Sequence, residues 1–377
     1  MRNLPIQSEC CGCGACSQIC PVNAITLNPN NKGFLVPAIN ENKCINCGNC
    51  ERVCPVLHPD TPNNHFSYKI LNAKNPDIRN GGSSGGVFRL LAEYVLSSKG
   101  IVIGAAFDEN FKVVHQEVDD IRQIGRLCGS KYVQSDSSCS YKIVKQALCN
   151  GKLVLFSGTA CQIAGLKGFL GMDYPTLLTV DVLCHGVPSP YIWGKYIEHL
   201  KKQGTLKKIN FRDKKTGWRA YSFTVERDKG ESGAIWYNNE YMQLFIDNVS
   251  LRDSCFSCRF KDIHHKNSDI TLGDFWRVDQ LGYENDDTGL SIVQVHSEKG
   301  EKVLLEILDQ CNQFSNNVDF DEVLPPTDDS RKPVEKNPYS DLFFRVMHSK
   351  MPWRICMFSF KFQRKVLKLT KSINRST

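Results

Sequence analysis

Short apolar runs separated by polar, glycine-containing turns fill the chain after residue 66 and predict a mixed α/β domain. Runs with the length and composition of β-strands lie at residues 68–73, 101–107, 113–118, 153–156, 177–183, 208–211, 221–226, 269–276 and 290–295. Apolar residues at helical spacing occupy most of the intervals between these runs. Helices are predicted at residues 87–95, from 119, up to 150, from 160, and at 190–202, 241–247 and 301–308.

The first 57 residues follow a different pattern. Between Cys20 and Cys44 a strand, a polar turn and a second strand predict a hairpin. The polar stretch HPDTPNN follows and has the composition of a linker. We therefore divide the chain into a small unit at 1–57, a linker at 58–66, a mixed α/β domain at 67–325 and a tail at 326–377.

The tail is basic and amphipathic. Residues 331–377 contain twelve Lys and Arg and only two acids, a net charge of +10, so the first 330 residues carry −3 of the total +7. This distribution gives no support to nucleic-acid binding by the whole protein. From Arg345 onward, apolar side chains are interleaved with cations, as in segments that bind an anionic membrane face or an acidic partner. A helix packed on its own domain is the alternative.

Length and composition limit the class of protein. The 377 residues have room for about two or three domains. The longest apolar runs, such as 101–107, are far shorter than the roughly 20 residues that a membrane-spanning helix needs. The chain has 18 cysteines, yet it begins MRNLPIQSECCG without an apolar signal core. We therefore expect a reducing cytoplasm rather than a disulfide framework.

Eight cysteines form two identical C-x-x-C-x-x-C-x-x-x-C-P motifs. They are Cys10, Cys13, Cys16 and Cys20, then Cys44, Cys47, Cys50 and Cys54. Three thiolates at this spacing can bind one face of a 4Fe-4S cube while the fourth binds the other cube. Cys54 is therefore predicted to complete the first cluster, and Cys20 the second. Zinc is the alternative, but it leaves the fourth cysteine and the proline of each motif unexplained.

Four later cysteines form a second candidate metal site. Cys161 starts a predicted helix, and Cys184 ends the next strand, where open α/β sheets hold their ligands. Cys255 and Cys258 form a further C-x-x-C pair. Four thiolates suit another 4Fe-4S cluster or an all-thiolate zinc site, and we favour the cluster beside two others. Six cysteines lack ligand spacing and are interpreted as small apolar residues, namely Cys11, Cys128, Cys139, Cys149, Cys311 and Cys356.

Two loops are candidates for binding a nucleotide-bearing cofactor. Residues 80–86, NGGSSGG, lead into the helix at 87–95, whose free N–H groups and dipole favour a phosphate. A plain capped turn is the alternative. Residues 129–132, GSKY, combine a flexible glycine, a hydroxyl, a cation and a ring that can stack. An ordinary surface turn would have the same composition.

Six motifs taken together resemble the coenzyme F-420 hydrogenase/dehydrogenase beta-subunit family. They are Ser84-Gly85-Gly86, Gly129-Ser130-Lys131-Tyr132-Val133, Gly158-Thr159-Ala160-Cys161-Gln162, Cys184-His185-Gly186-Val187-Pro188-Ser189-Pro190, Phe211-Arg212-Asp213-Lys214 and Ser254-Cys255-Phe256-Ser257-Cys258. This resemblance covers about residues 68–308, and residues 9–56 resemble a bacterial-type two-cluster ferredoxin. The sequence departs from the family at Ala160 and Asp253, where proline is usual or frequent.

The resemblance implies an α+β ferredoxin-like two-cluster domain followed by a mixed α/β flavin-binding domain. It implies FAD held by Ser83, Ser84, Gly85, Gly86, Gly129, Ser130, Lys131, Tyr132, Gly158 and Thr159. It also implies a third 4Fe-4S cluster on Cys161, Cys184, Cys255 and Cys258. A flavin can exchange two electrons with a substrate and single electrons with clusters. Lys131 and His185 are the candidate catalytic residues.

We accordingly expect an FAD- and 4Fe-4S-dependent oxidoreductase. Its small-molecule substrate would be a two-electron donor or acceptor, such as a deazaflavin or a biosynthetic intermediate of surface polysaccharide. A redox partner protein or the ferredoxin pool would exchange single electrons with it, no nucleic acid is expected, and the basic tail could touch the inner face of the membrane. The alternatives are a non-catalytic electron-transfer subunit of a larger redox complex, docked through the tail, and a zinc-stabilised interaction protein.

Overall fold

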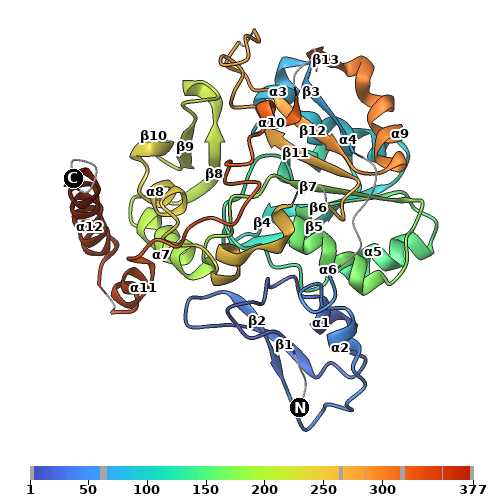
Figure 1. The fold of residues 1–377 in the computed structure, drawn as a ribbon, viewed down its shortest axis with the longest axis horizontal. Coiled ribbons are helices and arrows are strands. Elements are labelled where there is room, and N and C mark those ends of the chain that lie inside the picture. Colours follow the sequence, from blue (N-terminus) through green and yellow to red (C-terminus); the bar gives the residue numbers. More distant parts are fainter. Residues whose placement is uncertain are drawn as a thin grey trace.

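The computed structural model describes residues 4–59, 66–262, 266–284, 286–314, 319–349 and 351–373, and only the backbone of 366–373. A small N-terminal unit lies against a larger α/β body, and the C-terminal helices lie along another edge of that body (Figure 1). The linker predicted at 58–66 falls largely outside the described residues.

The N-terminal unit contains one hairpin and two short helices. β1 (Ile25–Pro29) and β2 (Leu35–Ile39) pair antiparallel, which confirms the predicted hairpin. α1 (Ala15–Ile19) and α2 (Asn49–Arg52) each begin after a left-handed glycine, Gly14 at φ 81° and Gly48 at φ 75°. Each glycine precedes the third cysteine of its motif by two residues, so the two motifs have the same local fold.

An eight-stranded sheet forms the centre of the larger body, in the order β13-β3-β12-β11-β7-β6-β4-β5. Its strands are β3 (Ser67–Ala73), β4 (Ile101–Phe107), β5 (Val113–Val118), β6 (Val154–Thr159), β7 (Leu177–Val182), β11 (Ile270–Asp274), β12 (Ser291–Val295) and β13 (Cys311–Phe314). The four neighbours β11, β7, β6 and β4 run parallel, and the flanking strands pair antiparallel. The sequence predicted all of these strands except β13.

Helices cover both faces of this sheet. α4 (Val87–Ser97) and α9 (Glu298–Ile307) pack on the face to which Leu155 points. α5 (Ser140–Cys149) and α6 (Ala160–Leu170) pack on the opposite face, around Phe156. Successive strand residues point to opposite faces, so the continuous apolar run of β6 reflects burial on both sides.

A second sheet lies beside the first, in the order β10-β9-β8. β8 (Leu206–Asp213), β9 (Ser222–Arg227) and β10 (Gly230–Ile235) share a core with α7 (Pro190–Lys201) and α8 (Glu240–Ile246). The strands predicted at 208–211 and 221–226 are confirmed, but they do not join the main sheet. β10 was not predicted because its residues are largely exposed and carry little apolar signal.

Two local predictions were wrong. The helix predicted from residue 119 is only a 3-10 segment, Ile121–Arg126. The start of the predicted loop at 80–86 instead belongs to α3 (Pro76–Gly81), which Asn75 caps through a hydrogen bond from the Asp77 N–H. The remaining short helices are α10 (Phe320–Val323) and the 3-10 segments Lys214–Thr216, Trp236–Asn238, Asp253–Ser257, Arg259–Lys261 and Leu308–Gln310.

The tail packs on its own domain with one face. Phe343 of α11 (Ser340–His348) and Trp353 and Phe360 of α12 (Trp353–Ile373) are buried in the core that α7 and α8 share. The opposite face of α12 is open, since Phe358 is 74% and Phe362 63% exposed. Within the part of the chain that the structure describes, no helix is both long and apolar enough to cross a membrane.

Candidate functional site

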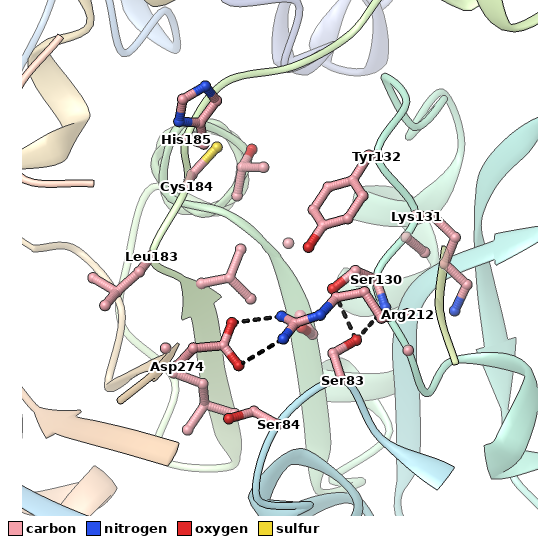
Figure 2. A pocket seen from close by; sticks show the side chains of 18 of the residues that line it. Ser83, Ser84, Ser130, Lys131, Tyr132, Leu183, Cys184, His185, Arg212 and Asp274 are labelled. Atoms are coloured by element: carbon pink, nitrogen blue, oxygen red, sulfur yellow. Dashed lines mark hydrogen bonds and ion pairs between the residues drawn. The ribbon is translucent and has the colours of Figure 1, made fainter. Parts of the chain in front are cut away.

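A cavity of about 520 Å³ lies at the carboxyl ends of β6 and β7, between the two sheets (Figure 2). This volume falls within the range of roughly 300–1,000 Å³ that is typical of cofactor and ligand sites. Nine of the ten predicted cofactor residues line it, Gly85 being the exception. Cys161, Cys184 and His185 line the same cavity.

Two loops far apart in the sequence form one wall of the cavity. The Ser130 N–H donates to Ser83 Oγ at 2.6 Å, and the two hydroxyls lie 2.9 Å apart. A Cβ at Gly85 would lie 2.6 Å from Leu71 O, so this glycine is needed for packing on β3. Gly129 has φ +79°, and a Cβ there would meet no described atom within 4 Å. The two predicted flavin loops therefore meet, and Gly129 leaves room beside them.

Tyr132 and Lys131 point in different directions. Figure 2 shows the Tyr132 ring directed toward the middle of the cavity and the Lys131 amine directed away from it. Tyr132 stacks on Phe245 with 4.6 Å between ring centroids. Lys131 Nζ donates to Arg126 O at 2.9 Å and Cys128 O at 2.8 Å. Burial lowers the pKa of Lys131 to about 8. In this conformation Lys131 holds its own loop closed, and its catalytic role stays a prediction.

The four later cysteines come together beside this cavity. Cys161 lies in the first turn of α6, where Thr159 and Gln162 form a capping box. Cys184 follows β7, Cys255 lies in the 3-10 segment Asp253–Ser257, and Cys258 ends that segment. Cys161 lies within electrostatic range of each of the other three. The structure thus joins residues that lie up to 97 positions apart in the sequence.

The chemistry of these thiols fits a cluster. Burial, with a further contribution from neighbouring cysteines, raises the pKa of Cys255 to about 12 and that of Cys184 still higher. Four crowded thiols ionise together only beside a strong positive charge, which cluster iron supplies. No three Cys, His, Asp or Glu side chains in the described residues are spaced for one metal ion, and this holds for the ferredoxin motifs too. Four thiolates are the ligand number of a 4Fe-4S cube and of an all-thiolate zinc site alike, so the third cluster stays a prediction.

A second, small cavity lies within the N-terminal unit. Cys10, Cys13, Cys16 and Cys54 all line it, so Cys54 lies beside the first motif, whose cluster it is predicted to complete. Cys11 lines both this cavity and the large one, and it lies within interaction range of Cys13 and Cys161.

The interpretation of the six remaining cysteines as small apolar residues stays a prediction for Cys11, which is half-buried. It was wrong for Cys139 and Cys149, which are exposed. Cys311 and Cys356 are buried, as that interpretation requires, and Cys128 is half-buried.

His185 is fixed beside Cys184. Its Nε2 lies 2.6 Å from Asn248 Oδ1, which only accepts, so Nε2 carries the proton. The ring contacts Phe245 edge-on at 5.0 Å between centroids. Nδ1 lies 3.9 Å from Asp329 Oδ2. His185 therefore lies where a catalytic acid could reach the cavity, although its role is still a prediction.

Sequence reasoning missed a buried ion pair on the cavity wall. Arg212 bonds Asp274 through two N–H groups at 2.5 and 3.1 Å, and its guanidinium lies between Tyr221 and Trp276 at 4.6 and 5.1 Å from the ring centroids. Burial alone would lower the pKa of Arg212, but Asp274 outweighs it and raises the pKa above its usual value. The sequence marked each residue separately, because Arg212 lies in one of the six family motifs and Asp274 lies in the acidic turn before Trp276.

Comparisons with known proteins identify two domains of the chain. Residues 9–57 match the family model described as 4Fe-4S dicluster domain, and residues 151–315 match the model of the C terminus of the coenzyme F420 hydrogenase/dehydrogenase beta subunit. No curated protein matches the chain. A chain of the F420-reducing [NiFe] hydrogenase complex from Methanosarcina barkeri, studied by xenon derivatization, aligns at 17% identity and a TM-score of 0.45. The alignment covers 80% of this chain and 92% of that one. The chain is thus an iron-sulfur redox protein related to the coenzyme F420 hydrogenase/dehydrogenase beta subunit, whose C-terminal domain it carries at residues 151–315 behind a 4Fe-4S dicluster domain at residues 9–57.

Proposed function

We propose that the protein is an iron-sulfur flavoprotein oxidoreductase that holds FAD in the large cavity and a third 4Fe-4S cluster on Cys161, Cys184, Cys255 and Cys258. One observation carries the proposal: a single cavity is lined by both predicted flavin loops and by two of these cysteines. A flavin bound there would convert two-electron into one-electron transfer. A cluster held by the cysteines beside it would accept or deliver the single electrons.

Each part of the cavity wall has its own role toward the cofactor. The hydroxyls of Ser83 and Ser130 and the amides around Gly129 would bind its polar part. The exposed face of the Tyr132 ring would stack on it, with Phe245 as support behind. The buried Arg212–Asp274 pair keeps this wall rigid without adding net charge.

The substrate is a small two-electron donor or acceptor that reaches the cavity near His185. Deazaflavins and intermediates of surface-polysaccharide synthesis are the classes to test first. A redox partner protein or the ferredoxin pool would exchange single electrons through the N-terminal clusters, in the cytoplasm or at the inner membrane face. His185 or Lys131 would move the substrate's proton.

The test compares the intact chain with a Cys255→Ser, Cys258→Ser variant after anaerobic purification. We expect the variant to lose about four irons and to keep the roughly eight of the N-terminal domain. A Cys139→Ser, Cys149→Ser variant, whose cysteines are exposed, is the matched control and should lose none. Equal iron in the intact chain and the cluster-site variant would refute the third cluster.

The exposed face of α12 favours a second candidate function, an electron-transfer subunit docked on a larger redox complex. Deleting residues 345–377 would uncover a core, since Trp353 and Phe360 are buried. Phe358→Ser with Phe362→Ser changes only the exposed face and is expected to abolish copurification of the complex while leaving flavin content unchanged. Retained complex formation would refute docking through α12. If the intact protein sediments with anionic vesicles and this variant does not, the exposed face of α12 is instead a membrane contact.

A further inference from the structure

The N-terminal unit contacts the rest of the protein through its first cysteine motif. Cys11, inside that motif, lies within interaction range of Cys13 on one side and of Cys161 on the other. Cys13 is a predicted ligand of the first ferredoxin cluster, and Cys161 belongs to the four-cysteine site. Cys11 also lines both cavities, so one side chain lies between the two cluster-binding sites.

Two glycines of α6 allow this approach. A Cβ at Gly165 would lie 2.7 Å from Cys13 Cβ and 2.8 Å from Cys13 Sγ. A Cβ at Gly168 would lie 2.6 Å from Val53 O, next to Cys54. Any side chain at either position would push the first motif away from the helix that carries Cys161. Tyr141 reinforces the contact, because its hydroxyl lies 2.8 Å from Cys13 O and 2.9 Å from Gln162 O.

The residues that flank the Cys255-x-x-Cys258 pair also hold the N-terminal unit. Arg252 donates to Cys10 O at 2.6 Å and to Leu35 O at 3.1 Å. Arg259 Nη1 donates to Val56 O at 2.8 Å. Asp253 lies 2.7 Å from Lys32 Nζ. Contacts on both sides of the pair therefore fix the N-terminal unit against the four-cysteine site.

The first half of the second motif lies at the outside, whereas Cys50 and Cys54 are buried. Cys47 is exposed, and Ile45 in the same loop is 61% exposed. A Cβ at Gly48 would meet no described atom within 4 Å. The loop around Cys47 thus faces solvent, whereas the first motif faces α6 and Arg252.

We propose that Cys11 couples the first ferredoxin site directly to the four-cysteine site by a hydrogen bond to their ligand sulfurs, which makes the first site the inner one and the second site the outer one. The proposal rests on the function proposed above. Its consequence is that single electrons from an external one-electron carrier enter or leave at the loop around Cys47.

Redox potential is the readout, because hydrogen bonds to ligand sulfurs tune it. Removing an S–H donor destabilises the reduced, more negative cluster and lowers the potential. Cys11→Ala removes no ligand, so it should keep about twelve irons and lower the potential of the first-site cluster, the four-cysteine cluster or both. Cys311→Ala, a buried cysteine outside both ligand sets and both cavities, is the matched control and should change no potential.

Two glycine variants test the contact between the first motif and α6 without changing the Cys11 thiol. Gly165→Ala should weaken the magnetic interaction between the two inner clusters in the electron paramagnetic resonance spectrum of the dithionite-reduced protein. Gly194→Ala, also within a helix and with no described atom within 4 Å of the added Cβ, should leave the spectrum unchanged. Signals are assigned with Cys47→Ser, which affects only the second site.

The outcomes separate the two proposals. Twelve irons with unshifted potentials in Cys11→Ala overturn the coupling and leave the proposed function standing. A shift confined to the second-site cluster overturns the assigned order. About eight irons in the intact chain would remove the four-cysteine cluster and overturn both.

Discussion

Removing Asp274 is expected to leave a cation unpaired in the wall of the large cavity. The side chain of Arg212 is 3% exposed and that of Asp274 17%. Asp274→Ala deletes both of their hydrogen bonds and also the acceptor of the Trp218 indole N–H, which lies 3.0 Å from Asp274 Oδ1. The guanidinium would then keep only the Tyr221 and Trp276 rings.

The magnitude follows from burial. Breaking a buried ion pair costs about 3–5 kcal/mol, and the partial exposure of Asp274 favours the lower end. Loss of the indole hydrogen bond adds about 1 kcal/mol. At about 2–4 °C per kcal/mol for a domain of this size, we expect the midpoint of thermal unfolding to fall on the order of 10 °C. The Arg219–Asp279 pair is exposed, at 39% and 65%, so Asp279→Ala should cost no more than about 1 kcal/mol.

The assay is thermal unfolding of the anaerobic protein, followed by far-ultraviolet circular dichroism, with Asp279→Ala as the matched control. An Arg212→Met, Asp274→Leu double variant should recover much of the loss, because no charge is then left unpaired. If Asp274→Ala lowered the midpoint no more than Asp279→Ala, the interpretation of Arg212 as a buried, pair-dependent cation would be refuted.

Three other changes test separate parts of the account. Gly85→Ala places a Cβ 2.6 Å from Leu71 O and should lower the flavin-to-protein ratio. Gly125→Ala is the control, because its Cβ would meet no described atom within 4 Å, and it should leave the ratio unchanged. Equal ratios in the two variants would contradict the assignment of the loop around Gly85 to flavin binding. Burial lowers the pKa of His115 to about 4 in the folded protein, below its ordinary value of about 6.5. Between these two pH values the unfolded chain binds a proton at His115 that the folded protein does not. The free energy of unfolding should therefore fall by up to about 3 kcal/mol as the pH falls through this window. In urea titrations at several pH values, His115→Gln should make the free energy of unfolding less dependent on pH. An unchanged pH dependence would show that another group causes it. Phe358→Ser with Phe362→Ser should leave the unfolding midpoint within about 2 °C of the original, because both side chains are exposed, and a larger fall would show that α12 buries that face.

Local patterns were enough to predict most of the main sheet. Runs such as 101–107 and 177–183 are buried on both faces, so their apolar character is continuous and their ends are sharp. β10 was missed because Gly230, Glu231 and Ser232 are exposed and carry no strand signal. β13 is only four residues long, and two of its central residues are exposed.

The ligand sets depend on spacing and were accessible from sequence, whereas the contacts between domains were not. Cys11 does not belong to a ligand motif, and it lies between Cys13 and Cys161 because α1 packs on α6. The Arg212–Asp274 pair joins residues 62 positions apart on different sheets. Nothing in the local sequence of either residue specifies the other.

The most direct test of the central claim is to determine iron and flavin together in the intact chain after anaerobic purification. The proposed function predicts about twelve irons and about one FAD per chain, four irons being held by each of three clusters. A protein with its full iron but no flavin would contradict it.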